Sequence, residues 1–331
     1  MNGTCPAHLP LKQLISAPRF KKYRDHATTA LKIPEYQANE AAARLYMWNA
    51  SVAAAYMPSI ALAEVVVRNS MNTTICEHFN ISSDVGWHTL VDCKDKVPPW
   101  DTSGAFPVPP LKLTQRDADQ LIAGFNKIKR RFERMSARVH DTPNGDDMVG
   151  GSSLGLWLAL VDKGVVRDSQ LNYHDNIWEP YLQNAFPGFT GSRGALLNDL
   201  RQFQELRNKC AHHEPLLHDD RWHQKKVSLV IKIARYVDGE VARYIQDAQQ
   251  ITYVVDQRSS YLAGECYFSQ NADVYGYDIP SASKIAAIRF WLVASAMRWS
   301  MPGVVRRSAL SEPPTTATAR QRRTLSAWSC A

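Results

Sequence analysis

The chain has 331 residues, of which 45% are hydrophobic and 21% are charged. This length allows one large or two ordinary domains, and the composition excludes a collagenous, fully disordered or disulfide-scaffold protein. The six cysteines are scattered without a C-x-x-C pair, which indicates reduced thiols. The net charge is +7, and residues 304–331, with five arginines and one acid, supply +4 of it. Charge alone therefore gives weak support for nucleic-acid binding.

The sequence predicts a cytoplasmic protein without a membrane-spanning segment. The N-terminal residues lack the basic and apolar regions of a secretory signal. The most apolar late segment, residues 285–297, contains Arg289 and is shorter than the roughly 18–20 apolar residues that span a bilayer. We therefore expect no membrane association.

Hydrophobic spacing predicts an all-α fold from the first elements onward. A helix is expected after Ser16, because Ser before a proline in the first turn is a helix start. A long helical region follows over residues 33–79, in which Pro58 is expected to break or kink the helix. Five prolines and a glycine then predict a surface loop over residues 97–110.

A second amphipathic helix is expected to begin at Thr114, with an apolar stripe from Leu121 to Met135. Its opposite face carries basic residues that form a candidate RNA-binding surface: Lys127, Lys129, Arg130, Arg131, Arg134 and Arg138. A charge run of this kind is more often only a solvated helix face. Residues 142–153 are rich in Gly and Asp and predict a loop. A short apolar helix is expected over residues 155–161, before an aromatic, irregular stretch.

The last expected unit is a helix pair. Leu196 to Leu206 form the apolar face of the first helix, which Pro215 is expected to end, and residues 227–245 form the second. The pattern decays afterwards. We therefore expect a helical region over residues 1–255 and a loosely packed or disordered extension over residues 256–331.

A polar cluster closes the first helix of this pair: Arg207-Asn208-Lys209-Cys210-Ala211-His212-His213-Glu214-Pro215. On an ideal helix Asn208 and His212 lie roughly 40° apart, with Glu205 on the same polar side. Arg207 lies about 140° from His212. Bringing Arg207 and His212 to one point therefore requires a bent side chain, a helix end or a second copy of the helix.

The residue types in this cluster suit RNA cleavage without a metal. Arginine neutralises a phosphate through paired donors, and histidine transfers protons near neutral pH. In this interpretation Asn208 orients His212, and Glu214 steadies Arg207 or His212. The alternative is structural: Arg207 and Asn208 brace the helix pair, and His212 and His213 only terminate the helix.

The motif R-N-x-x-A-H-H-E-P resembles the signature of Abi-like (abortive infection) proteins of the HEPN superfamily. Three further motifs agree with this resemblance: S-x-x-R-F-x-x-Y from Ser16, L-Y-x-W-N from Leu45 and E-V-x-x-R-N from Glu64. Trp87, Trp157, Trp178, Phe186 and Arg193 also lie where the family has anchors. The resemblance covers roughly residues 12–250.

The resemblance implies a HEPN-like helical bundle with additional helices and a role in phage defence through an endoribonuclease that halts growth. Arg207 and His212 match the catalytic pair, Asn208 is the polar residue after the arginine, and His213 lengthens the gap by one, so either histidine is a candidate. Such enzymes generally build the site from two copies of the motif, which predicts a homodimer. RNA is the implied substrate.

A second candidate is the segment Glu64-x-x-x-Arg68-Asn69. Glu64 and Arg68 are four residues apart, the spacing of an exposed helix ion pair. A second half-site would require a histidine at position 73, where the sequence has threonine. We favour a supporting role in which Glu64 and Arg68 brace the active helix.

The sequence indicates neither a metal nor a cofactor. His212, His213, His218 and His223 form no H-x-x-x-H pattern, and no phosphate-binding glycine loop is present. Two further classes of function remain open: a non-catalytic RNA-binding or phage-sensing protein, and a toxin held by an antitoxin protein or a small RNA.

Overall fold

The computed structural model describes residues 15–92, 99–100, 110–135 and 137–264, and these form an all-α fold. Most of the loop predicted over residues 97–110 lies outside these residues. The apolar segment 285–297 and the arginine-rich segment 304–331 also lie outside them.

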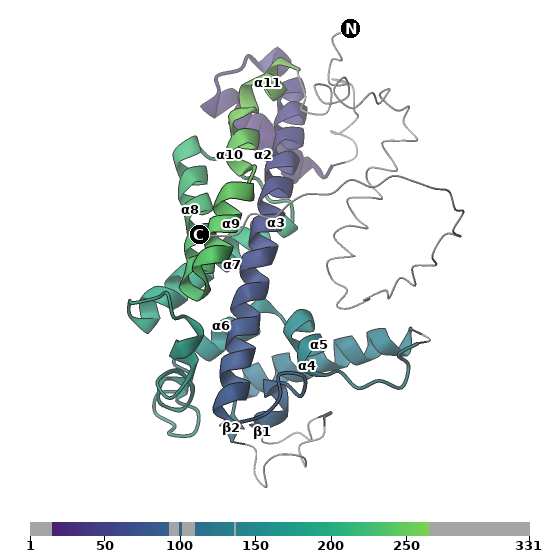
Figure 1. Ribbon diagram of the computed structural model, residues 1–331. Coiled ribbons are helices and arrows are strands. Elements are labelled where there is room, and N and C mark those ends of the chain that lie inside the picture. Colours follow the sequence, from purple (N-terminus) through teal and green to yellow (C-terminus); the bar gives the residue numbers. More distant parts are fainter. Residues whose placement is uncertain (1–14, 93–98, 101–109, 136, 265–331) are drawn as a thin grey trace, which may run out of the picture.

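Helix α3 (Ala38–His78) is the central element and runs through the length of the body (Figure 1). Its buried side chains recur every three or four residues from Leu45 to Ile75, so one apolar stripe faces the neighbouring helices along several turns. The helices packed against it include α2 (Ala17–Asp25), α7 (Arg193–Ala211), α8 (Asp220–Val237), α10 (Ile251–Asp256) and α11 (Arg258–Ala263).

Of the break or kink expected at Pro58, the break is absent, because α3 is one continuous helix across it. Pro58 and Ala54, whose carbonyl loses its intrahelical partner, both lie on the exposed side of the helix. Water can therefore satisfy the Ala54 carbonyl, while the buried stripe holds the two halves of the helix in place.

By length and composition alone, the segment Glu35–His78 could cross a membrane, a test that the core helix of a soluble protein also passes. In this fold other helices pack along α3. Its buried side chains include the polar Asn49, Glu64, Arg68 and Asn72. We therefore interpret α3 as the core helix of the bundle.

The middle of the chain surrounds the lower half of α3 in Figure 1. Helix α4 (Gln115–Glu133) begins at the predicted Thr114, whose side chain accepts a hydrogen bond from the Asp117 amide. The loop predicted over residues 142–153 is wrong in part, because α5 (Gly145–Gly151) forms there. Asn144 and Asp147 make a capping box that stabilises this short, glycine-containing helix. Helix α6 (Leu154–Val161) matches the apolar helix expected around Trp157.

The second helix of the predicted pair is two helices, α8 and α9 (Gly239–Ala248). Asp238 has an extended backbone and caps α9 by accepting hydrogen bonds from the amides of Glu240 and Val241. The apolar residues keep helical spacing across the break between α8 and α9, so the sequence predicted one helix. α11 packs on α3, so the boundary expected at residue 255 falls inside the helical body.

The remaining elements are short. Strands β1 (Val91–Asp92) and β2 (Leu111–Lys112) pair in parallel. The aromatic stretch after residue 172 is irregular, as expected, with only a π-helical and a 3₁₀ turn. The short turns are η1 (His26–Ala30), η2 (Glu35–Gln37), η3 (Trp87–Leu90), η4 (His174–Trp178) and η5 (Leu182–Ala185).

Candidate nucleic-acid site at the end of helix α7

Helix α7 ends inside the polar cluster, and His213 closes it. The His213 amide donates to the Cys210 carbonyl at 3.2 Å, and the Glu214 amide donates to the Lys209 carbonyl at 2.9 Å. This is the Schellman pattern, in which the residue after the cap is left-handed and is usually glycine. Here it is His213, with a φ of 52°. The helix therefore stops at Ala211 through its own hydrogen bonds, not at Pro215 as expected.

His212, His213 and Glu214 are exposed at this helix end, and 36% of the Arg207 side chain is exposed. The Arg207 side chain is directed to α3, where its Nε donates to Glu64 Oε2 at 3.2 Å. Arg207 and His212 are thus presented on one helix end, with Arg207 held from the side.

Glu64 joins two arginines rather than forming an exposed ion pair. It accepts from Arg68 on its own helix and from Arg207 on α7, and the side chains of Glu64 and Arg68 are only 11% and 8% exposed. Arg68 also donates to the Val149 carbonyl at 3.1 Å. Burial lowers the pKa of Arg68, and the charge of Glu64 opposes that shift. Glu64 thus contacts α7 through Arg207, whereas Arg68 contacts Glu64 and the Val149 carbonyl, and neither side chain has the exposure of a surface ion pair.

Other supporting residues have different partners from those expected. The Asn208 side chain accepts from Arg207 Nη1 at 3.3 Å rather than orienting His212. Glu205 pairs with Lys209 at 3.0 Å on the exposed surface, which lowers the Glu205 pKa. Asn69 is exposed, whereas Asn72 is buried, and the Asn72 side chain accepts from the Trp87 amide at 3.4 Å.

The segment after α7, residues 212–218, is held through its backbone by side chains from distant elements. Arg19 of α2 donates to the His212 carbonyl at 3.3 Å. Asn49 of α3 donates to the Glu214 carbonyl at 3.3 Å and accepts from the Leu216 amide at 2.5 Å. The motifs that contain Arg19 and Asn49 therefore both contact the backbone of the motif that begins at Arg207.

The same segment is anchored further along by His223 and Arg258. His223 of α8 contacts the Leu216 carbonyl at 3.1 Å through Nε2, and the Tyr56 hydroxyl lies 3.2 Å from His223 Nδ1. Burial lowers the His223 pKa to about 4, so this histidine is neutral near pH 7. Its Nε2 then carries the proton donated to Leu216, and Nδ1 accepts from Tyr56. Arg258 donates to the His218 carbonyl and stacks over Trp48.

Cys210, inside the motif, is not a candidate nucleophile. Burial raises the pKa of Cys210, which lies inside the motif, to about 12, so its thiol is protonated near neutral pH and is a poor nucleophile. Cys210 and Cys76 are both free. Among the residues that the structure describes, no group of three or more His, Cys, Asp and Glu could hold a metal ion.

The basic surface predicted on α4 is present but lies apart from the end of α7. Lys127, Lys129, Arg130 and Arg134 are exposed, and Arg131 is partly so. Their end of α4 projects from the body on the side opposite α8 (Figure 1). Arg138 does not belong to this helix face, because α4 ends at Glu133. It packs over Phe132 and forms ion pairs with Asp141 and Asp147, so its role is structural.

Sequence reasoning missed the backbone anchors of the 212–218 segment. Asn49 and Arg19 had been noted only as parts of motifs, and a side chain that binds a distant backbone leaves no local pattern. Arg258 lies in the stretch that had been assigned to the extension. His223 had been considered only as a metal ligand, although its place on the apolar side of α8 was a visible signal of burial.

No protein-family model matches this chain, and no curated protein and no solved structure matches it either. The resemblance to Abi-like proteins therefore depends on the sequence motifs alone.

Proposed function

We propose that this protein is an Abi-like HEPN endoribonuclease that acts in abortive infection, with Arg207 and His212 or His213 at its centre. The observation that carries the proposal is the end of α7. There an arginine and two exposed histidines occupy a helix end that Arg19, Asn49 and Glu64, all from separate motifs, hold in place. Exposed side chains on a rigidly anchored backbone are what a binding or catalytic site for a large substrate requires.

The chemistry uses the chain's own side chains. A neutral imidazole takes the proton of a ribose 2′-hydroxyl, whose oxygen attacks the adjacent phosphorus. The bond from phosphorus to the 5′-oxygen breaks, and a protonated histidine donates a proton to that oxygen. The products are a 2′,3′-cyclic phosphate and a free 5′-hydroxyl. Arg207 stabilises the charge that develops on the phosphate oxygens.

A homodimer is part of this proposal. Arg207 is directed to α3, whereas His212 follows the last residue of α7, so one copy of the helix does not aim both at one phosphate. Two helix ends facing each other supply an arginine from one copy and a histidine from the other. We expect the cleaving form to elute as a dimer in size-exclusion chromatography with light scattering. A monodisperse monomer with full RNase activity would refute this part.

The enzyme proposal is tested by incubating purified protein with total RNA in EDTA and mapping the termini. Wild type is expected to cut and leave cyclic phosphates, and Arg207→Ala and the double variant His212→Ala/His213→Ala are each expected to lose at least a hundredfold in rate. Arg243→Ala and His140→Ala are matched controls, because both residues are exposed elsewhere. Cleavage by wild type no faster than by Arg207→Ala ends the enzyme proposal.

The second candidate is an RNA-binding protein that does not cleave. It is favoured by two contacts: Arg207 donates to Glu64 and to Asn208, an arrangement that holds a phosphate-binding arginine without aiming it at His212. In that case wild type retains RNA during purification, Arg207→Ala releases it, and neither protein cuts.

A further inference from the structure

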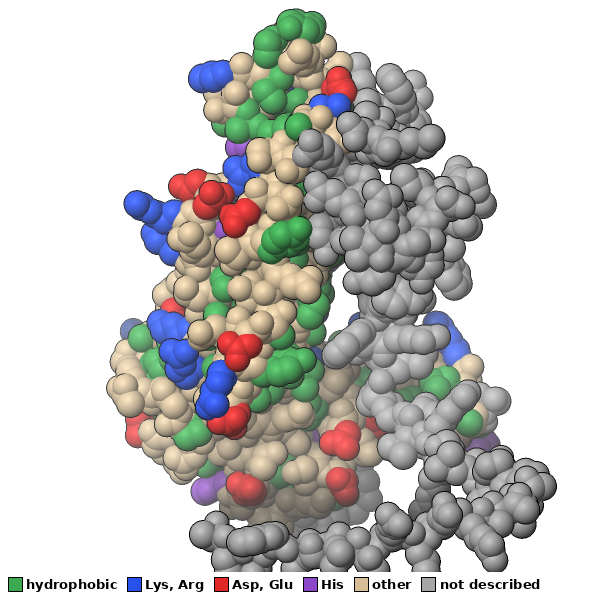
Figure 2. All heavy atoms as spheres, turned by 45° about the horizontal axis from the view of Figure 1, so that its top comes forward, with side chains coloured by type: hydrophobic (Ala, Val, Ile, Leu, Met, Phe, Trp, Pro, Cys, Tyr) green, Lys and Arg blue, Asp and Glu red, His purple; other side chains and the backbone are tan. Residues whose placement is uncertain are grey.

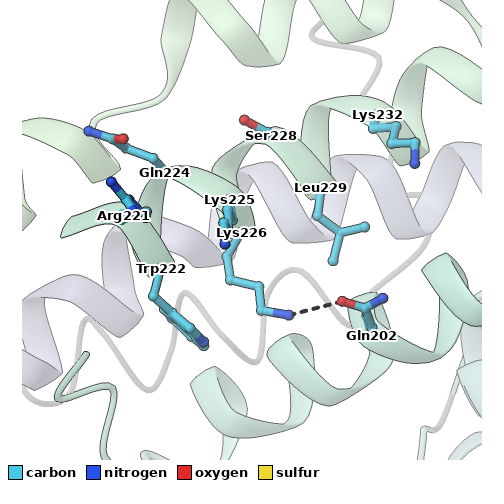
Figure 3. A pocket seen from close by; sticks show the side chains of 9 residues that line it. All are labelled: Gln202, Arg221, Trp222, Gln224, Lys225, Lys226, Ser228, Leu229 and Lys232. Carbon is cyan, nitrogen blue, oxygen red and sulfur yellow. Dashed lines mark hydrogen bonds between the residues drawn. The ribbon is translucent and has the colours of Figure 1, made fainter. Parts of the chain in front are cut away.

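A basic groove lies between α7 and α8, next to the segment that follows α7 (Figure 3). It has a volume of about 550 Å³. Its lining comes from α8 apart from one residue of α7: Gln202, Arg221, Trp222, Gln224, Lys225, Lys226, Ser228, Leu229 and Lys232. Four of these nine residues are cations and none is acidic.

Two of the four cations bind other side chains of the fold, and the other two have no such partner among the described residues. Lys232 pairs with Asp199 at 2.8 Å, and Lys226 donates to Gln202 Oε1 at 3.3 Å. Arg221 and Lys225 are exposed, one turn apart on α8, and have no ion-pair or hydrogen-bond partner within the parts of the chain that the structure describes. They are therefore available to bind phosphate.

The end of the groove is aromatic and reaches the candidate site. Trp222 is partly exposed and stacks on His218, with ring centroids 4.0 Å apart. His218 belongs to the anchored segment after His212 and His213. Burial lowers the pKa of His218, Lys209 of α7 and Lys226 lower it further, and the charge of Asp219 opposes them. Figure 2 shows Lys and Arg side chains, mixed with acids, along the edge where α8 lies.

We propose that this groove binds the phosphate backbone of single-stranded RNA beside the Arg207–His212 site, with Arg221 and Lys225 as phosphate contacts and Trp222 as a base contact. Exposed cations interleaved with an aromatic ring suit a single strand, in which unpaired bases stack on aromatic side chains. A groove of this volume has the size of a small-ligand site, so it accommodates a short piece of a single strand. The inference rests on the RNA substrate of the proposed function, but not on cleavage.

The test measures binding of a fluorescent single-stranded oligoribonucleotide by anisotropy over a range of salt concentrations, in His212→Ala/His213→Ala protein so that the probe stays intact whichever histidine acts. We expect Arg221→Ala/Lys225→Ala to weaken binding at least tenfold and to reduce the slope of log K against log salt by about 1.4, the value for two lost phosphate contacts. Trp222→Leu is expected to weaken binding of the single strand more than that of a duplex.

Lys129→Ala/Arg130→Ala on α4 is the matched control, because it removes the same charge from the other candidate surface. It is expected to change affinity less than twofold. An equal loss in both double variants, or a loss in the α4 variant alone, overturns the groove proposal, as does unchanged binding by the groove variant.

The two proposals fail separately. Groove-dependent binding by a wild type that does not cut supports the groove and refutes the nuclease. Cleavage and binding that are unchanged by Arg221→Ala/Lys225→Ala refute the groove and leave the nuclease.

Discussion

At the scale of single residues, His213 has a conformation that its side chain does not favour. The left-handed backbone at the end of a helix costs a residue with a Cβ atom about 1 kcal/mol relative to glycine. Non-glycine residues in this region cluster at functional sites, where the side chain is needed despite the strain. At a φ of 52°, folding stability alone would favour glycine at position 213. A site that uses the imidazole requires histidine there.

We predict that His213→Gly raises the free energy of unfolding by about 1 kcal/mol, measured by urea denaturation, because glycine relieves the strain. If His213 is the acting histidine, the same variant loses RNA cleavage, whereas His212→Ala retains it. Asn80→Gly is the control for the backbone effect, because Asn80 is also left-handed, with a φ of 53°. A destabilised His213→Gly protein would contradict the strain argument.

At the scale of elements, the 212–218 segment is anchored by His223, one of two buried histidines whose protonation couples stability to pH. The buried His223 and His88 are both neutral in the folded protein, with burial lowering each pKa to about 4, whereas an unfolded histidine titrates near pH 6.5. Below about pH 6.5 the unfolded chain binds protons that the folded chain does not. Stability is therefore full above that pH and falls as the pH drops toward 4.

We expect the free energy of unfolding to fall by roughly 3 kcal/mol per buried histidine between pH 7 and pH 4. His223→Gln, which keeps a donor for the Leu216 carbonyl, should remove His223's share of this fall. The measurement is chemical denaturation at several pH values, with the exposed His140→Gln as control. A pH dependence equal to wild type in His223→Gln would show that His223 is not buried as neutral imidazole.

Sequence periodicity predicted the helices that bury one apolar face. It did not predict helix boundaries that are set by capping hydrogen bonds to the backbone. It located α3, α4, α6 and α7, since their apolar residues recur at helical spacing. It missed α5, which depends on the Asn144–Asp147 capping box, and the turn at Asp238. In the site, Arg207 and Glu64 were found because each belongs to a recognisable motif, whereas the backbone contacts of Asn49 leave no pattern in the sequence.

At the scale of the whole molecule, the helical body extends past the boundary that the sequence suggested. Arg44 donates to the Leu262 carbonyl at 2.6 Å, and Ser51 and Tyr261 are hydrogen bonded at 2.8 Å. These contacts tie α11 to α3. We therefore assign residues up to 264 to the folded unit.

We predict that a chain ending at residue 264 unfolds at a higher temperature than one ending at residue 255, by several degrees, because the shorter chain lacks α11 and Arg258. Both truncations leave out the same residues after 264, so the difference reports on residues 256–264 alone. Equal melting temperatures would show that residues 256–264 do not stabilise the fold and that the folded unit ends at residue 255.

The anchoring of the 212–218 segment also orders events during synthesis. Its contacts reach from Arg19 to Arg258, so they join the beginning and the end of the folded unit. A ribosome making this chain produces Arg207 and both histidines some fifty residues before Arg258. The nascent protein therefore carries every reactive side chain before Arg258, which anchors the His218 carbonyl, can complete the contacts that hold this segment. A protein proposed to attack cellular RNA is thus incomplete while it is still being translated.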